Sequence, residues 1–250
     1  MDCRRTLVVA LGLLAAVGGC VPSATLPSVP GDADHPKKQL KPSTLISLGK
    51  LSEESASDPK NGPAEQERLR DQARQSYQEA LKLDPNNLDA LTCLAYLYTS
   101  MNDHEHAIAT YARAAKSHPK NAALYHAYGM CHAQSKEWEP AITNLRQAVA
   151  LEPEQRLYAH TLGFCLARVG KYDDSYAVFA KVDGAASAHY DVARMLHHVQ
   201  QDDKAKEHLQ LALQAKADFA PARQMLTVLE TPATPAGREA ALNAIQNIDN

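Results

Sequence analysis

The chain has 250 residues, of which 45% are apolar and 22% are charged, a balance typical of a globular protein with a buried core. Its formal net charge of −3 lacks the strongly basic character that accompanies nucleic-acid binding, so we expect no nucleic-acid partner. With only three Phe and one Trp, and with Ala and Leu abundant, the composition favours packed helices over a β-sandwich.

Residues 1–19 have the features of an export signal rather than of a folded segment. Two arginines near the start precede an uncharged apolar run, which is too short to cross a bilayer of about 30 Å as a permanent helix. The run ends in Val17-Gly18-Gly19-Cys20, which resembles the lipobox of bacterial lipoproteins, although Gly at its second position departs from the common pattern. The alternative is an ordinary secretory signal with an incidental cysteine.

The lipobox resemblance implies that Cys20 becomes the lipid-modified first residue of an exported protein. We expect this protein to be anchored on the periplasmic side of a bacterial membrane. The expected membrane is the outer one in a Gram-negative cell, because Val21 and not an acidic residue follows the cysteine. Residues 20–42 contain five prolines and few large apolar side chains, which predicts a flexible tether that holds the folded domain away from the membrane.

The remainder of the chain repeats itself with a period of 34 residues. A small residue lets two helices cross closely, a large apolar neighbour fills the space between layers, and a proline ends the second helix. Several series that share one period therefore indicate repeated helical hairpins. The series are Pro85, Pro119 and Pro153; Ala80, Ala114 and Ala148; Ala73, Ala107, Ala141 and Ser175; Tyr77, Tyr111, Leu145 and Phe179; and Leu94, Tyr128 and Leu162, each followed by Ala95, Gly129 or Gly163.

This pattern resembles the tetratricopeptide repeat (TPR) family over roughly residues 43–230. The resemblance implies an all-α fold, a right-handed α-solenoid of about five TPR helical hairpins with a C-terminal capping helix. The hairpins are expected at residues 43–87, 88–121, 122–155, 156–184 and 186–217, and the capping helix at residues 220–230.

The two ends of the array are less regular than its middle. Counting back from Pro85 places Lys60-Asn61 where a Leu-Gly pair belongs, and Leu48-Gly49 lies twelve residues earlier. We therefore expect an insertion at residues 55–63 between the helices of the first hairpin. Residues 231–250 are expected to form a proline-containing linker and then a short amphipathic helix over residues 238–248.

The TPR resemblance implies that the first helix of each hairpin lines a concave groove for a protein or peptide partner. Side chains four residues apart on that helix share one face, which gives four candidate rows. The large apolar members would anchor an extended or helical segment, and the arginines and histidines would favour an acidic flank. For any single residue the alternative is plain packing or a solvated surface. The rows are Thr92, Tyr96 and Ser100; His126, Met130 and Gln134; His160, Phe164 and Arg168; and Tyr190, Arg194 and His198.

These features together predict a membrane-tethered scaffold that binds other proteins, in the assembly of a cell-envelope machine such as a pilus, a secretion apparatus or the outer-membrane machinery. The groove lacks the Lys and Asn with which some TPR proteins clamp a C-terminal carboxylate, so we do not expect that ligand.

The rival hypothesis is an enzyme or metal-binding protein that uses the His-rich groove. Successive repeats should separate His126 from His160 by about 8–10 Å or more, too far for one zinc ion. The sequence has no HExxH or CxxC spacing and no marked nucleophile, so we expect no catalytic residues, no metal and no cofactor. Cys131 and Cys165 are also one period apart, which disfavours a disulfide and favours two small buried groups.

Overall fold

The structure is a computed structural model, and it describes residues 40–231. Within that range the regular secondary structure consists of eleven α-helices. They are α1 (Pro42–Ala56), α2 (Pro63–Leu83), α3 (Leu88–Ser100), α4 (His104–Ser117), α5 (Ala122–Gln134), α6 (Trp138–Leu151), α7 (Arg156–Arg168), α8 (Tyr172–Asp183), α9 (Ala185–His198), α10 (Asp202–Ala215) and α11 (Ala220–Glu230).

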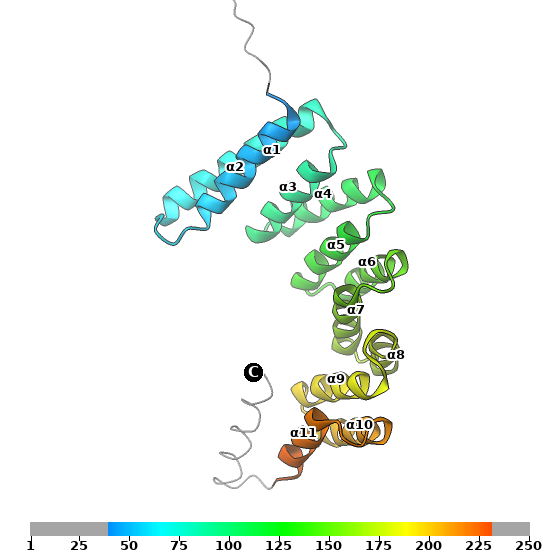
Figure 1. Cartoon of the computed structure of the whole chain (residues 1–250). Helices are drawn as coiled ribbons and strands as arrows, with labels where there is room; N and C mark the ends of the chain where they lie inside the picture. The colour runs from blue at the N-terminus through cyan, green and yellow to red at the C-terminus, as the bar shows by residue number, and fades with distance from the viewer. Residues whose placement is uncertain (1–39, 232–250) are drawn as a thin grey trace, which may run out of the picture. The chain divides into compact units, whose positions relative to one another are not determined.

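The helices pair in chain order into five hairpins, from α1 with α2 to α9 with α10, and α11 packs on α10 (Figure 1). Each helix also contacts the next one along the chain, so successive hairpins stack on one another. This arrangement confirms the expected all-α solenoid of five hairpins followed by a further helix.

The periodic small and large residues form the contacts between the helices. The alanines of the two small series, from Ala73 to Ala148, are fully buried, and so is Ser175, whose hydroxyl donates a hydrogen bond of 2.9 Å to the backbone oxygen of Gly163. The large series, Tyr77, Tyr111, Leu145 and Phe179, is buried beside them. The core therefore runs along the stack between first and second helices, as expected of repeats that are stabilised by their neighbours.

The first hairpin is longer than the others, mainly because its helices are longer. Gly49 is the eighth residue of α1, as Ala95 is of α3, but Ala73 is the eleventh residue of α2 whereas Ala107 is the fourth of α4. α1 has 15 residues against 13 in α3, and α2 has 21 against 14 in α4.

The predicted insertion at residues 55–63 is confirmed only in part: residues 57–62 separate α1 from α2, against residues 101–103 between α3 and α4, while most of the added length is helical. Residues 55 and 56 continue α1, and Pro63 opens α2, where its missing N–H costs nothing because the first turn of a helix has no acceptor for it. Additional helical turns satisfy the backbone groups of the extra residues, which a loop of the same length would leave to water.

Several predictions fall outside the described residues. They are the export signal at residues 1–19, lipidation at Cys20, the tether up to residue 39, and the linker and short helix beyond residue 231. Among the helices that the structure describes, none combines the length and the apolar character needed to cross a membrane.

Candidate functional site: two pockets on the first helices

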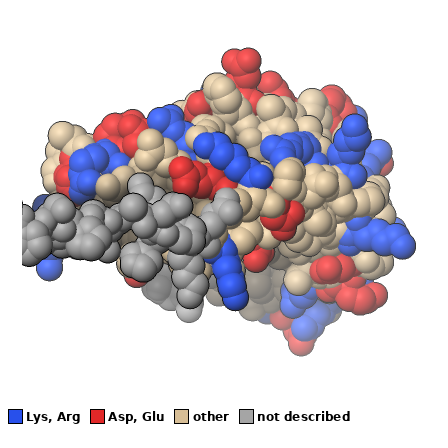
Figure 2. Space-filling view, turned by 90° about the horizontal axis from the view of Figure 1, so that it is seen from above, with Lys and Arg blue, Asp and Glu red and all other residues tan. Residues whose placement is uncertain are grey.

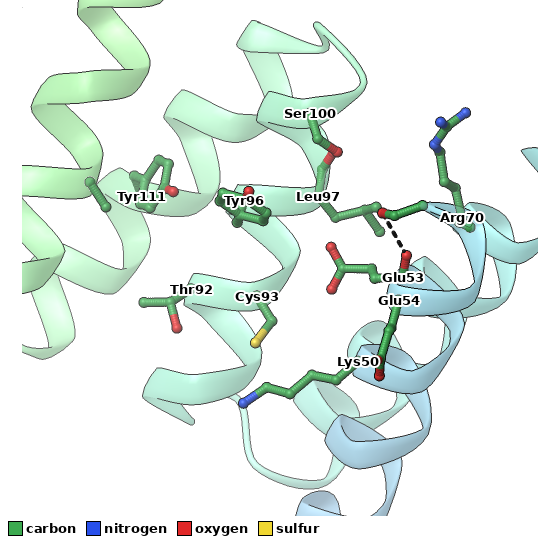
Figure 3. A pocket seen from close by; sticks show the side chains of 13 residues that line it. Lys50, Glu53, Glu54, Arg70, Thr92, Cys93, Tyr96, Leu97, Ser100 and Tyr111 are labelled. Carbon is green, nitrogen blue, oxygen red and sulfur yellow. Dashed lines mark hydrogen bonds between the residues drawn. The ribbon is translucent and has the colours of Figure 1, made fainter. Parts of the chain in front are cut away.

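The first pocket lies between α1 and α3, the first helices of the first two hairpins, and has a volume of about 490 Å³. Figure 3 shows Lys50, Glu53 and Glu54 on α1 across from the labelled side chains of α3. The predicted row on α3 lies within this lining. Its members are Thr92, Tyr96 and Ser100.

The first pocket combines the exposed phenol of Tyr96 with charged side chains of both signs, among them Lys50 and Glu53. The hydroxyl of Tyr77 donates a hydrogen bond to the carboxylate of Glu53. Burial raises the pKa of Glu53, and the Tyr77 hydrogen bond and the charge of Lys50 oppose that rise. Burial likewise raises the pKa of the Cys93 thiol, so this thiol lacks the lowered pKa of a nucleophilic cysteine.

The second pocket lies at the other end of the array and has a volume of about 440 Å³. α7, α9 and α11 supply most of its lining, which is largely apolar, with an arginine and two histidines among the polar groups. Four predicted row residues lie in it together: Phe164, Tyr190, Arg194 and His198. The other lining residues are Met195, His197, Gln200, Met225, Val228 and Leu229.

The middle residues of the first three rows are large, apolar and exposed to solvent. The exposed fraction is 65% for Tyr96, 36% for Met130 and 42% for Phe164. Each sits one position after the small residue of its helix, and therefore on an adjacent face that the neighbouring helix leaves open. An exposed apolar side chain repeated at one position of successive hairpins is a pattern that packing alone does not require.

Other residues of the rows already contact side chains within the array, so a partner would have to bind beside these contacts or replace them. The Nε2 atom of His126 lies 3.0 Å from the Thr161 hydroxyl of the next hairpin, and its ring packs on Tyr158 with the centroids 4.8 Å apart. The guanidinium of exposed Arg168 lies 5.4 Å from the centre of the Trp138 ring, a cation–π contact. Exposed Gln134 lies outside both pocket linings.

Sequence reasoning missed the contribution of α1. The Leu48-Gly49 pair sets the register of α1 against Leu94-Ala95 of α3, which makes Lys50 and Glu54 the counterparts of Tyr96 and Ser100. That register was readable from the sequence. The contribution of α11 to the second pocket was not, because no periodic residue points to it.

A group of three side chains has ligand atoms within 4.8 Å of one another, a spacing suited to a metal ion: His160, Asp183 and Asp191. Oδ2 of the nearly buried Asp183 lies 2.6 Å from Nε2 of His160 but accepts no well-aligned hydrogen bond. Arg156 pairs with Asp183, and Arg194 lies 4.0 Å from Asp191. Burial raises the pKa of Asp191, while His160 and Arg194 oppose that rise. Because two arginines already balance two carboxylates, we interpret this group as an ion-pair network between the fourth and fifth hairpins.

The buried cysteines have no features of a catalytic site. Cys131 and Cys165 are buried and carry free thiols, and burial raises the pKa of Cys165 to about 11. On the face that Figure 2 shows, basic and acidic side chains are interspersed. The pockets on the first helices are therefore the strongest candidate site in the described part of the chain.

A stack of antiparallel hairpins whose first helices line pockets defines an α-solenoid of the helical-repeat class. The model of the family described as tetratricopeptide repeat matches residues 66–131, from α2 into α5. Over residues 66–131 the chain therefore matches the tetratricopeptide-repeat family, and the hairpins on either side continue the same fold, which supports a scaffold for protein–protein interactions.

Comparison with solved structures gives the same fold. The structure of the MamA protein aligns with a TM-score of 0.55 at 20% identity, over 72% of this chain and 93% of that one. PilF of Pseudomonas aeruginosa aligns with a TM-score of 0.53 at 21% identity, over 83% and 90%. YrrB, described as a TPR protein with an unusual peptide-binding site, aligns with a TM-score of 0.51 at 21% identity, over 72% and 89%. These identities are too low to carry more than the fold, and no curated protein sequence matches the chain.

Proposed function

We propose that this protein is a membrane-tethered scaffold that binds a segment of a partner protein along the first helices of its hairpins. The observation that carries the proposal is the row of exposed apolar residues, Tyr96, Met130 and Phe164, at one position of successive hairpins, with two pockets beside it. Aromatic side chains that stand exposed next to a pocket are frequent anchors of protein interfaces.

The chemistry of the two pockets suggests the character of the partner segment. The second pocket offers apolar surface from Phe164 and Met195 with Arg194 at its side. A segment that places an apolar side chain there and an acidic one beside it would match both features. The first pocket adds the phenol of Tyr96 and the ammonium of Lys50.

The groove can be tested by capture of envelope proteins on residues 21–250. The variant combines Tyr96→Ala with Phe164→Ala, and the control is Leu211→Ala, which truncates a 40%-exposed leucine on the second helix α10, outside both pockets. We expect the double variant to lower the affinity for the captured partner at least tenfold, since interface anchors contribute more than about 1 kcal/mol each. The control should bind as the parent does. Equal capture by the double variant and the control would contradict binding in the groove.

The membrane tether is proposed from the sequence of residues 1–20. The lipobox-like Val17-Gly18-Gly19-Cys20 supports acylation at Cys20, and the prolines that follow support a spacer. The combination of a lipid anchor with TPR hairpins fits a part in the assembly of a cell-envelope machine, whether a pilus, a secretion apparatus or outer-membrane components.

Cys20→Ser tests the anchor. The variant should lose fatty-acid labelling and move from the membrane fraction to the soluble fraction, whereas Cys3→Ser should leave both unchanged. Fatty-acid labelling that persists in Cys20→Ser would exclude the lipobox assignment.

A further inference from the structure

The last described helix, α11, follows α10 as the first helix of a sixth hairpin would. The described part of the chain contains no second helix to pair with it. Ala222 and Met225 are buried, and α11 packs on α10 as α3 packs on α2. The 19 residues that follow Thr231 are the part of the chain that could cover the remaining surface of α11.

The face on which a second helix would pack is polar in α11. The fourth, eighth and eleventh residues of α3 are the buried Leu91, Ala95 and Tyr98. The same positions of α11 hold Arg223, Thr227 and Glu230, and all three side chains are exposed. A following helix packed there would bury the charges of Arg223 and Glu230. Within the described residues Arg223 has only a backbone acceptor, the oxygen of Ala217 at 2.7 Å, and neither side chain has an ion-pair partner. The chain beyond α11 is therefore unsuited to complete a sixth hairpin.

The apolar side of α11 faces the second pocket instead. Val228 and Leu229 line it together with Met225, opposite Phe164 and Met195. Because α11 ends at Glu230, the chain leaves the helix one residue after this lining.

The sequence that follows has the pattern and the reach to return to the pocket. Ala241, Leu242, Ile245 and Ile248 follow one another at the spacing of a helix face, and Asn243 and Asn247 fall on the opposite side. The seven residues 231–237 can span about 23 Å when extended. That reach exceeds the length of α11, which is about 16 Å for eleven residues.

We propose that residues 238–248 of the same chain occupy the second pocket, with Leu242 and Ile245 against the apolar side chains of α7, α9 and α11. The occupant is this segment because the chain enters at the edge of the pocket and because the alternative face of α11 is polar. Where the proposed function holds, this segment competes with the partner for the second pocket and leaves the first pocket free.

The test uses methyl resonances of methionine in the purified full chain. Met195 and Met225 line the second pocket, whereas Met101 and Met130 lie outside it and serve as internal references in the same spectrum. The docking variant is Leu242→Asp with Ile245→Asp. The matched control is Asn243→Asp with Asn247→Asp, which adds the same charge on the opposite side of the segment.

We expect the docking variant to shift the Met195 and Met225 methyl resonances by more than a linewidth, while Met101 and Met130 stay in place and the control spectrum matches the parent. Parental spectra should be unchanged on tenfold dilution. Unshifted Met195 and Met225 in the docking variant would overturn the proposal, and concentration-dependent shifts would assign the pocket to a second copy instead. Partner capture is measured separately: a docking variant that shifts the methyl resonances but captures no partner would leave docking intact and count against the proposed function.

Discussion

The residues that matter most to this fold are the small ones at the helix crossings, because each is matched to one large neighbour. A Cβ atom placed on Gly163 would lie 2.4 Å from the ring of Phe179, and one on Gly49 would lie 2.4 Å from the ring of Tyr77. On Gly129 it would meet Leu145 at 2.7 Å. The small residue and the large residue are therefore one packing unit, repeated along the chain.

Gly163→Ala should destabilise the protein. The added methyl group would lie 2.4 Å from the buried Phe179 ring and must displace it, which places the cost towards the upper end of the about 1–3 kcal/mol typical of overpacking and above the gain of about 1 kcal/mol in helix propensity. The measurement is the free energy of unfolding in urea. Gly62→Ala is the control for the added methyl group, since nothing lies within 4 Å of its Cβ; as Gly62 is the N-cap of α2, this variant should lose only the preference of an N-cap for Gly over Ala. A Gly163→Ala protein more stable than the parent would contradict this packing.

At the scale of the element, equivalent helices begin in different ways. Asn87 and Asn121 precede α3 and α5, and their side chains accept hydrogen bonds from the backbone N–H groups of Ala90 at 3.0 Å and Leu124 at 2.8 Å. Gln155 holds the same position before α7 with a similar extended backbone but makes no such bond. Its longer side chain does not fit the geometry of an N-cap.

Asn121→Ala should lower the free energy of unfolding by about 1 kcal/mol, because the Leu124 N–H loses its acceptor. Gln155→Ala should change it by less than about 0.5 kcal/mol, as is usual for a surface substitution. Gln155→Asn is expected to raise stability, since it would restore the missing cap. Equal losses for Asn121→Ala and Gln155→Ala in thermal and urea unfolding would show that the cap contributes nothing.

At the scale of the whole molecule, partly buried histidines make stability depend on pH. Burial lowers the pKa of His126, His189 and His208, and His208 lowers that of His189 further. The Nδ1 atoms of His189 and His208 lie 3.2 Å apart, so the pair accommodates one shared hydrogen but not two positive charges. These residues lie on α5, α9 and α10, and their effects on stability have the same sign.

The pKa of these histidines is about 6.5 in the unfolded chain and lower in the folded protein. Below pH 6.5 the unfolded chain therefore binds more protons than the folded protein does. The free energy of unfolding should therefore fall as the pH drops from about 7.5 through 6.5 towards the lowered folded pKa values. His208→Gln keeps a hydrogen-bonding side chain but no longer titrates, so it should reduce the slope. Gln134→Ala, an exposed substitution that removes no titratable group, should retain the parental slope. Urea unfolding at pH 7.5 and 5.5 checks both, and a parental stability that rises on acidification would contradict the argument.

The repeat was readable from the sequence because it depends on contacts between residues close together in the chain. The period of Ala73, Ala107 and Ala141 with the large residues beside them predicts the helices, their pairing and the buried core, since each hairpin packs mainly on its neighbours. The same reasoning placed Tyr96 and Phe164 one position after the small residue, where the structure shows them exposed. The period did not predict the layout of the first hairpin. Both of its helices are longer than those of the next hairpin, and Leu48-Gly49 therefore lies twelve residues before the place that the period gives.

What the sequence determined by itself is therefore the solenoid and the face of each first helix. The tertiary structure alone decided which of those faces form a pocket. His126 turns to Thr161 of the next hairpin and His160 to Asp183, whereas Phe164, Arg194 and Leu229 meet in one cavity. The physical reason is that periodicity records only the contacts repeated in every hairpin. A pocket depends on side-chain orientations and on the angle between particular neighbours, which are not repeated.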